Sequence, residues 1–235
     1  MTSEYFLKQA EAGVLLISFN SSHKKNAFTN AAWRSLAVEL DAAKQDDDVT
    51  VVVLTGVGDD FSAGHDLADS PEKDAEGNLA YQYTERALAA FDKPLLMCPK
   101  GYAIGGAATM LLHADMVYAG ESLKLKLPFA ALGLSPEFGS SYLLPKVAGP
   151  QLAAEMLFCG EFVTADEALA SNIVTRVYSD TELLEKTLEI ARSIAAKRLD
   201  ALRMAKRCLI AARRDALSAA YRVEAKAIED ALFGR

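Results

Sequence analysis

The sequence predicts an α/β core of alternating strands and helices, followed by a C-terminal region that is helical almost throughout. Up to about residue 180, short runs rich in β-forming residues alternate with segments of helical periodicity. Beyond that point apolar residues recur at helical spacing, for example at Leu184, Leu188 and Ala191. We therefore expect a core formed by residues 1–180 and a helical region formed by residues 181–235.

A strand, a helix and a second strand are predicted near the N-terminus. Residues 14–19 are rich in β-forming side chains and predict the first strand. Residues 29–43 place apolar side chains on one helical face, and Thr29 is suited to be the N-cap. The apolar residues 50–55 predict the next strand. This order predicts two parallel strands with the helix covering one face of the sheet.

The middle of the chain is predicted to contain a surface loop, a helix and a glycine-rich turn. Residues 68–78 include Pro, Gly, Asn and many charges, which is typical of a loop. A helix predicted at 79–91 leads to an apolar strand at 94–98. The glycine-rich turn 101–106 follows, and the apolar residues 107–112 predict a buried helix after it.

Shorter patterns predict the last part of the core. Residues 123–127 alternate strictly between leucine and lysine, which is typical of a strand. Other short runs predict strands at 115–119 and 173–177 and helices at 152–158 and 165–170.

Composition excludes several classes of protein. The 235 residues include 25 Lys and Arg and 32 Asp and Glu, a net charge of −7, which argues against nucleic acid as the main partner. No apolar run is long enough to cross a membrane, and the N-terminus does not resemble a leader peptide. Cys98, Cys159 and Cys208 lie far apart and lack the spacing of a metal site. We therefore expect a cytoplasmic protein without a metal ion or membrane contact.

Charge is unevenly distributed along the chain. Residues 186–235 contain 12 basic and 6 acidic side chains, whereas residues 1–185 contain 13 basic and 26 acidic ones. A solvated helix face is one interpretation of the basic region. Phosphate-binding side chains, or contact with an acidic neighbouring subunit, are the other two.

Two glycine-bearing turns carry the strongest functional pattern. Phe61-Ser-Ala-Gly-His-Asp-Leu67 and Gly101-Tyr-Ala-Ile-Gly-Gly106 each follow an apolar run. Glycine lets a ligand approach the backbone closely, and the free N–H groups at the start of a helix favour negative charge. Two such turns can direct backbone N–H groups to one point, as an oxyanion hole requires. Tight packing of the Gly-Gly helix against a strand is the alternative interpretation.

These turns and a third motif, Leu132-Gly-Leu-Ser-Pro-Glu137, resemble the enoyl-CoA hydratase/isomerase (crotonase) family in order and spacing. The resemblance extends over residues 14–231. It implies a crotonase-like spiral of ββα units with a C-terminal helical trimerisation region, and therefore a homotrimer or a dimer of trimers. It also implies an acyl-CoA thioester as substrate, with coenzyme A as part of the substrate and no separate cofactor.

The resemblance further implies which residues hold the substrate. The N–H groups of Ala63 and Gly106 are expected to stabilise the oxygen of the enolate that forms when the thioester loses a Cα proton. Lys24 and Lys25 match the family's N-terminal loop that contacts the CoA nucleotide, and a solvated lysine pair is the alternative. The substrate-binding residues implied in this way are Lys25, Ala27, Ala63, Gly64, His65, Asp66, Leu67, Gly106 and Phe129.

The acid/base residues differ from those of the family's hydratases. The two positions that carry glutamates in hydratases are occupied here by Thr109 and Phe129, so efficient hydration is not expected. Ser135-Pro136-Glu137 resembles instead the Δ3,Δ2-enoyl-CoA isomerases, in which this glutamate is the only acid/base. One carboxylate is sufficient for a 1,3-proton shift, because it can return the proton to another carbon. A helix start with Ser135 as N-cap and Pro136 at N1 is the alternative interpretation.

We therefore expect an isomerase that moves the double bond of a 3-enoyl-CoA to the 2-position. Glu137 is the expected proton shuttle, and Ala63 and Gly106 are expected to hold the dienolate oxygen. A neighbouring phenylalanine is expected to raise the Glu137 pKa by desolvation. His65 is an alternative base. A weak hydratase, another reaction of the family, or an acyl-CoA-binding protein without catalytic activity are the alternative functions.

Overall fold

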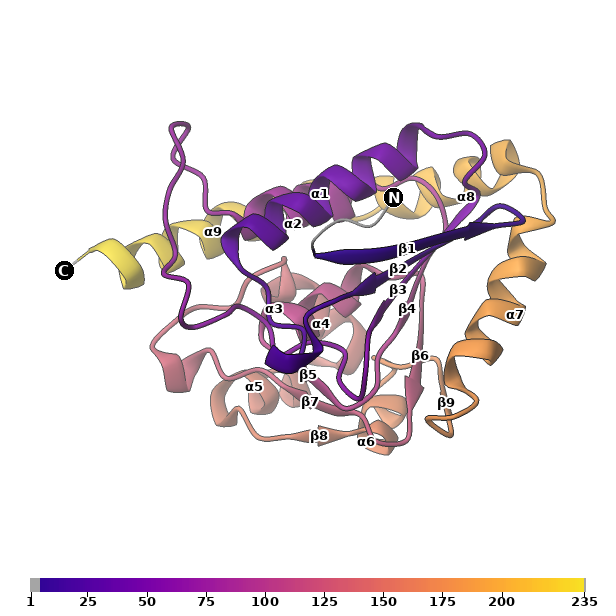
Figure 1. Cartoon of the computed structure of the whole chain (residues 1–235). Helices are drawn as coiled ribbons and strands as arrows, with labels where there is room; N and C mark the ends of the chain where they lie inside the picture. Colours follow the sequence, from indigo (N-terminus) through magenta and orange to yellow (C-terminus); the bar gives the residue numbers. More distant parts are fainter. Residues whose placement is uncertain (1–4, 235) are drawn as a thin grey trace.

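A six-stranded sheet forms the centre of the computed structural model, which describes residues 5–234 (Figure 1). Its strands are β1 (Phe6–Glu11), β2 (Val14–Phe19), β3 (Val51–Gly56), β4 (Leu95–Cys98), β6 (Met116–Gly120) and β9 (Arg176–Tyr178). They lie in the order β1-β2-β3-β4-β6-β9. β1 is antiparallel to β2, and the other neighbouring pairs are parallel. The parallel pairing predicted near the N-terminus is therefore confirmed.

The sequence predicts most of this sheet and misses its first strand. Four predicted strands agree with the structure to within one residue at either end: 14–19, 50–55, 94–98 and 115–119. The strand predicted at 173–177 shares only residues 176 and 177 with β9. β1 is missed because Phe6 is its only buried side chain, so its sequence lacks a clear alternation of apolar and polar residues.

A small second sheet brings the two glycine-bearing turns together. It consists of β5 (Tyr102–Ile104), β7 (Lys124–Lys126) and β8 (Val163–Thr164), and β7 is the centre of the strand predicted at 123–127. Ser62 pairs with Ala103 of β5 in an isolated parallel bridge. Ser62 belongs to the first glycine-bearing turn and β5 to the second, so this pairing places the turns side by side.

Helices cover both faces of the central sheet (Figure 1). α1 (Asn30–Gln45) and α2 (Tyr81–Ala90) pack on one face, and α7 (Leu183–Ala195) packs on the other. Thr29 is the N-cap of α1, as predicted, and its hydroxyl oxygen accepts a hydrogen bond from Ala32 N at 3.1 Å. α7 buries Leu183 and Ala191 against the sheet, so the region after residue 180 begins as part of the core.

The segment after the Gly-Gly turn differs from the prediction. The expected buried helix at 107–112 is a short α3 (Gly106–Thr109) followed by a 3-10 turn, η2 (Met110–His113). The helix start suggested at Ser135 is wrong, because α4 (Ser140–Ala148) begins only after Gly139.

The remaining helical elements are η1 (Ser22–Lys24), η3 (Ala130–Leu132), α5 (Pro150–Cys159), α6 (Ala165–Ala170), α8 (Leu199–Ala211) and α9 (Arg214–Phe233). The helices predicted at 152–158 and 165–170 are therefore confirmed.

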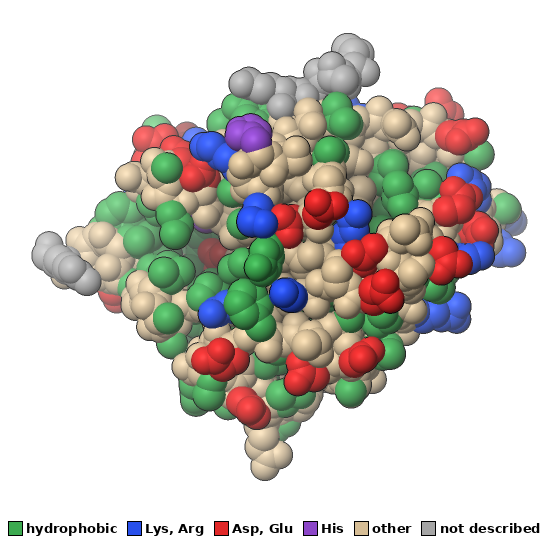
Figure 2. All heavy atoms as spheres, turned by 60° about the horizontal axis from the view of Figure 1, so that its bottom comes forward, with side chains coloured by type: hydrophobic (Ala, Val, Ile, Leu, Met, Phe, Trp, Pro, Cys, Tyr) green, Lys and Arg blue, Asp and Glu red, His purple; other side chains and the backbone are tan. Residues whose placement is uncertain are grey.

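Ion pairs attach the basic C-terminal region to acidic groups of the core. The buried Lys206 Nζ of α8 lies 2.7 Å from both carboxylate oxygens of Asp115. The Arg207 guanidinium donates to Asp92 Oδ2 at 2.7 and 2.9 Å. Part of the basic charge is thus neutralised within the chain. Figure 2 shows Lys and Arg side chains interspersed with Asp and Glu on another face of the molecule.

The described chain ends with the helices α8 and α9. No helix within residues 5–234 is long and apolar enough to cross a membrane. α9 extends away from the sheet at the end of the chain (Figure 1). The trimer implied by the family resemblance stays a prediction.

Candidate active site

The backbone of the two glycine-bearing turns is held together by hydrogen bonds around Ser62. Ser62 N donates to Tyr102 O at 2.9 Å, and Ile104 N donates to Ser62 O at 3.1 Å. Gly64 has a φ of +83°, and a Cβ built on it would lie 2.4 Å from Ile104 O and 3.8 Å from Gly106 N. The close approach of the turns therefore requires glycine at position 64, for both its conformation and its lack of a side chain.

The oxyanion donor expected at Ala63 is a wrong assignment. Ala63 N donates to Lys25 O at 2.8 Å, so this N–H group is already satisfied within the chain. Asp66 N donates to Phe28 O at 2.8 Å, which occupies a further N–H of the same turn. Of the N–H groups in the two turns, those of His65, Leu67 and Gly106 donate to no other described residue. A Cβ on Gly64 would lie close to Gly106 N, so His65, which follows Gly64, and Gly106 are the neighbouring donors that remain available to a ligand.

Gly106 is in direct contact with the carboxyl group of Glu137. A Cβ built on Gly106 would lie 2.6 Å from Glu137 Oε1 and 3.2 Å from the Phe138 ring. Gly105, just before it, has φ +56° and ψ −125°, a conformation that is essentially restricted to glycine. The Gly-Gly pair thus turns the backbone sharply and leaves space for a carboxyl group beside the free N–H of Gly106.

Glu137 lies in the turn that precedes α4 and has an environment unusual for a glutamate. Its carboxyl group lines a cavity, and burial together with the negative charge of Glu224 raises its pKa to about 8. Phe138 is fully buried next to it, which supports the predicted desolvation by a neighbouring phenylalanine. A carboxylate whose pKa is raised in this way is a stronger base than an exposed one and can exchange protons near neutral pH.

The cavity has a volume of about 440 Å³ and joins the free N–H groups, Glu137 and an apolar chamber. Of the predicted site residues, the structure brings Ala63, His65, Leu67, Gly106, Phe129 and Glu137 to its wall. The other lining residues are mainly apolar: Asn30, Trp33, Pro71, Leu79, Ala80, Tyr81, Ile104, Gly105, Pro128, Leu132, Leu134, Ser135, Ile228 and Leu232. An apolar cavity with a few converging polar groups is the usual form of a small-molecule site.

A family model described as enoyl-CoA hydratase/isomerase matches residues 9–232. This chain belongs to the enoyl-CoA hydratase/isomerase family. The predicted family and its crotonase-like α/β fold are therefore confirmed. Members of this family act on acyl-CoA thioesters, so the protein is an enzyme of the acyl-CoA hydratase/isomerase type.

Relatives with different activities have similar levels of sequence identity. The chain is 36% identical over 208 residues to a 2,3-dehydroadipyl-CoA hydratase of Escherichia coli (strain K12), covering 88% of this chain and 82% of that protein. It is 34% identical over 234 residues to the human enoyl-CoA delta isomerase 2, covering 96% of this chain and 59% of that protein. The crystal structure of an enoyl-CoA hydratase/isomerase from Pseudoalteromonas atlantica T6c superposes with a TM-score of 0.94 at 32% identity, covering 98% of this chain and 92% of that one.

The two positions that carry glutamates in the family's hydratases have no acid/base group in this family member. The Thr109 hydroxyl is buried and lies 3.3 Å from the carbonyl oxygens of Gly105 and Gly106, to which it donates. Phe129 is buried in the cavity wall. The His65 ring Nε2 lies 2.7 Å from Asp69 O, so its side chain is engaged with the loop that follows. Among residues 5–234, Glu137 is the one acidic residue that lines this cavity.

The remaining predicted binding residues lie outside the cavity wall. Lys24 pairs with Asp66 at 2.7 Å, and Lys25 pairs with Asp60 at 3.0 Å. Lys25 Nζ also lies 4.7 Å from the centre of the Tyr102 ring. Both lysines are thus ion-paired beside the first glycine-bearing turn, and the CoA contact implied by the family stays a prediction.

Two further predicted residues, Ala27 and Gly64, shape the turn and do not line the cavity. Ala27 N donates to Lys24 O at 3.1 Å, and Gly64 O accepts from Phe28 N at 2.7 Å. The first interaction lies within the N-terminal loop, and the second holds this loop against the first glycine-bearing turn. Their role in the structure is therefore to orient the backbone that presents the His65 N–H group.

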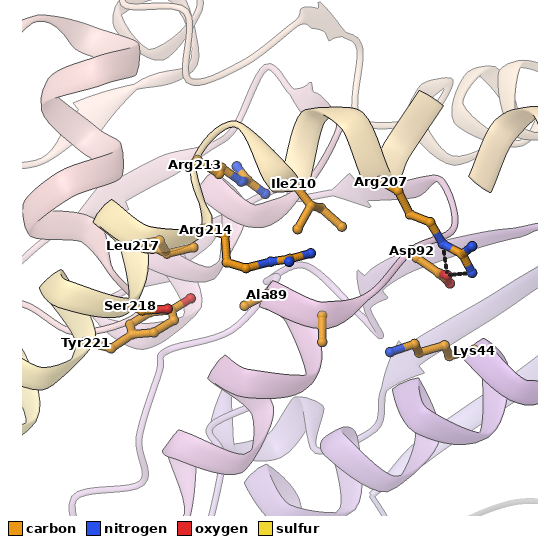
Figure 3. Close-up of a pocket in the computed structure, with 11 residues that line it drawn as sticks. Lys44, Ala89, Asp92, Arg207, Ile210, Arg213, Arg214, Leu217, Ser218 and Tyr221 are labelled. Carbon is orange, nitrogen blue, oxygen red and sulfur yellow. Dashed lines mark hydrogen bonds and ion pairs between the residues drawn. The ribbon is translucent and has the colours of Figure 1, made fainter. Parts of the chain in front are cut away.

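A second cavity of about 390 Å³ lies between α8, α9 and the end of α2 (Figure 3). Arg207, Arg213 and Arg214 line it, together with Asp92, and Arg207 is paired with that carboxylate. None of the site residues predicted from the sequence lines this cavity. The predicted site residues that line a cavity are therefore gathered at the cavity that contains Glu137.

Two buried glutamates close to Glu137 were not predicted from the sequence as part of the site. Glu85 of α2 and Glu224 of α9 are 5% and 3% exposed, and the charge of each contributes to the raised pKa of other groups nearby. Glu85 shares a helical face with the buried Leu88, and Glu224 shares one with the buried Ile228. An acidic residue on an otherwise apolar helix face is the sequence signal that could have identified both.

Proposed function

We propose that this family member is a Δ3,Δ2-enoyl-CoA isomerase that uses Glu137 as its only acid/base. The carboxylate removes a Cα proton from a 3-enoyl-CoA thioester. The electron pair of the C–H bond forms a double bond between Cα and the thioester carbon, and the π pair of the carbonyl group moves to the thioester oxygen, which gives a dienolate. The protonated Glu137 then returns the proton to Cγ, the electrons shift back, and the double bond lies between Cα and Cβ. No atom is gained or lost in the overall reaction.

The His65 and Gly106 N–H groups are proposed to hold the thioester oxygen as it becomes negative. Both are free within the described chain, and the two turns that carry them are hydrogen-bonded together. Loss of one such donor in other enzymes costs about 2.7–4 kcal/mol of transition-state stabilisation. The apolar remainder of the cavity suits the acyl chain, and its volume of about 440 Å³ suits a chain of modest length.

One observation carries this proposal: the carboxyl group of Glu137 lies beside Gly106, whereas Thr109 and Phe129 occupy the two positions at which the family's hydratases carry glutamates. Hydration requires one group to activate water and another to protonate carbon, whereas a proton shift within one substrate needs a single shuttle. The raised pKa of Glu137 supports the shuttle, because the same group must both take and return a proton. The 34% identity to a human enoyl-CoA delta isomerase is consistent with it.

Hydration is the rival function, because a 2,3-dehydroadipyl-CoA hydratase is 36% identical to this chain. Product analysis with two substrates separates the alternatives. We expect 3-enoyl-CoA to be converted to 2-enoyl-CoA, and 2-enoyl-CoA to give negligible 3-hydroxyacyl-CoA. Rapid hydration of 2-enoyl-CoA without isomerisation would favour a hydratase. Binding of both thioesters without turnover would favour an acyl-CoA-binding protein.

A further inference from the structure

A carboxyl group from the C-terminal helix reaches the turn that carries Glu137. Glu224 Oε2 accepts a hydrogen bond from Gly139 N at 2.7 Å, and Glu224 Oε1 accepts one from Ser141 N at 2.8 Å. Glu224 is 3% exposed, so these bonds are shielded from water. Glu224 thus binds the backbone two and four residues after Glu137, although it lies far away in the sequence.

The turn held in this way has a strained backbone. Phe138 and Gly139 have φ values of +57° and +67°, in the left-handed region, which is uncommon for a residue as bulky as phenylalanine. Such conformations persist where the surrounding structure enforces them. A Cβ built on Gly139 would lie 2.3 Å from Leu217 and 2.9 Å from Tyr221, so α9 packs directly on this turn. α9 therefore supplies both the packing and the hydrogen-bond acceptors that hold the turn.

One face of α9 connects this turn to both cavities. Leu217 and Tyr221, in its first half, lie beside Ala89 of α2 at the arginine-lined cavity (Figure 3). Glu224 follows Tyr221 by one helical turn, and Ile228 and Leu232 lie further along the helix in the wall of the enoyl-CoA cavity. These positions recur at spacings of three and four residues and therefore share one face. A single helix thus positions the Glu137 turn and closes the substrate cavity.

Glu224 is also the group around Glu137 that is best placed to carry a negative charge. The other titratable groups that face this turn are Tyr81 and Glu85 from α2, His113 from η2, and Tyr221 from α9. Burial raises the pKa of both tyrosines and lowers the pKa of His113 to about 4, so all three are neutral at pH 7.

The two glutamates in this set differ in their hydrogen bonds. Glu85 has one backbone N–H partner, Phe138, which lowers its pKa, but burial and the charges of Glu224 and Glu137 outweigh it and raise the pKa to about 9, which keeps Glu85 protonated near neutral pH. Burial raises the pKa of Glu224 as well, but the N–H donors from Gly139 and Ser141 favour its ionised form. Both Glu224 oxygens accept N–H groups, which is the arrangement of a carboxylate.

We propose that Glu224 is a positioning residue for the isomerisation: its carboxylate accepts the N–H groups of Gly139 and Ser141 and fixes the turn that aims Glu137 at the substrate. The negative charge of Glu224 acts on Glu137 as well, because it raises the pKa of that carboxyl group. This inference rests on the proposed role of Glu137 as the acid/base. It adds the C-terminal helix to the catalytic unit, since the helix controls the orientation and the proton affinity of the catalytic carboxyl group.

Glu224→Gln tests both parts of this inference. The glutamine amide nitrogen cannot accept the N–H group that it would face, so either Gly139 N or Ser141 N loses its acceptor, and the negative charge is lost. We expect kcat to fall at least about tenfold with a smaller change in KM. The acidic limb of the kcat/KM profile should move to lower pH by about half a unit or more, because removal of a nearby negative charge lowers the Glu137 pKa.

Two further variants separate charge and position from general damage to the helix. Glu229→Gln is the matched control, because Glu229 lies on the same helix but is exposed and paired with Lys73. This variant should retain the native kcat and pH profile. Glu224→Asp keeps the charge but shortens the side chain, so kcat should fall while the pH midpoint stays nearer the native value.

The Glu137 titration can be measured without turnover. Carbon-13 NMR of protein labelled at the glutamate carboxyl carbon gives the midpoint directly, and Glu137→Gln identifies the resonance. A lower midpoint in Glu224→Gln than in Glu229→Gln supports the inference. Equal midpoints together with equal kcat values in these two variants would overturn it. If the native protein does not isomerise 3-enoyl-CoA, the proposed function fails, while the NMR comparison still decides whether Glu224 controls Glu137.

Discussion

Replacement of Glu137 by glutamine tests the proposed proton transfer directly. Glutamine has nearly the same size and can occupy the same space beside Gly106, but it cannot accept the Cα proton. A positioned acid/base typically contributes about 10²–10⁴ in rate. At about 1.36 kcal/mol per factor of ten, this corresponds to about 2.7–5.4 kcal/mol of activation free energy. We therefore expect kcat for 3-enoyl-CoA isomerisation to fall at least about a hundredfold.

The pH of the comparison determines how large the difference is. Glu137 must be ionised to accept a proton, and its pKa is raised to about 8. One unit below its pKa a carboxyl group is only about one-tenth ionised, so native kcat/KM should rise about tenfold between pH 7 and pH 9. Glu137→Gln should show no such rise. The contrast between the two enzymes is therefore largest near pH 9.

The assay measures conversion of 3-enoyl-CoA to 2-enoyl-CoA by chromatography at several pH values, with acyl-CoA affinity and thermal unfolding measured in parallel. Thr109→Ala is the matched control, because the Thr109 hydroxyl donates to the carbonyl groups of Gly105 and Gly106 at the start of its own short helix. It should retain most of the native kcat. The mechanism is wrong if Glu137→Gln retains nearly full activity while His65→Ala abolishes turnover.

Four further expectations follow from the same geometry. Gly106→Ala should lower kcat at least about a hundredfold in single-turnover measurements, since its Cβ would lie 2.6 Å from Glu137 Oε1 and disturb the oxyanion donor. His65→Ala should change kcat by less than about tenfold, which is below the contribution expected of an acid/base group, because the proposed donor at this position is the backbone N–H. The pKa of Glu85 is about 9 in the folded protein and about 4.3 in the unfolded chain, so the free energy of unfolding should fall as pH rises between these values. Thermal unfolding should therefore show that Glu85→Gln is more stable than the native protein at pH 9 but not at pH 4. Light scattering at micromolar protein should show a trimer or a dimer of trimers, and a monomer would contradict the family-based expectation.

The sequence by itself determined the family, the main strands and helices, and the identity of the catalytic carboxyl group proposed here. These features depend on local information. The helical face of α1 and its Thr29 cap are visible as apolar spacing and a capping residue. The glycines at 64, 105 and 106 show where the backbone must turn sharply or allow close approach. The Ser-Pro-Glu motif identifies Glu137 without any knowledge of its neighbours.

Only the tertiary structure decided which N–H groups are free and which charges surround Glu137. The family resemblance implied the Ala63 N–H as a donor, but Lys25 O, from a distant loop, occupies it, while the N–H of His65 in the same turn stays available. The raised pKa of Glu137 depends on burial and on Glu224, which α9 brings to it from 87 residues further along the chain. A hydrogen bond or a desolvated charge is a property of groups that meet in space, so their sequence positions alone could not predict either result.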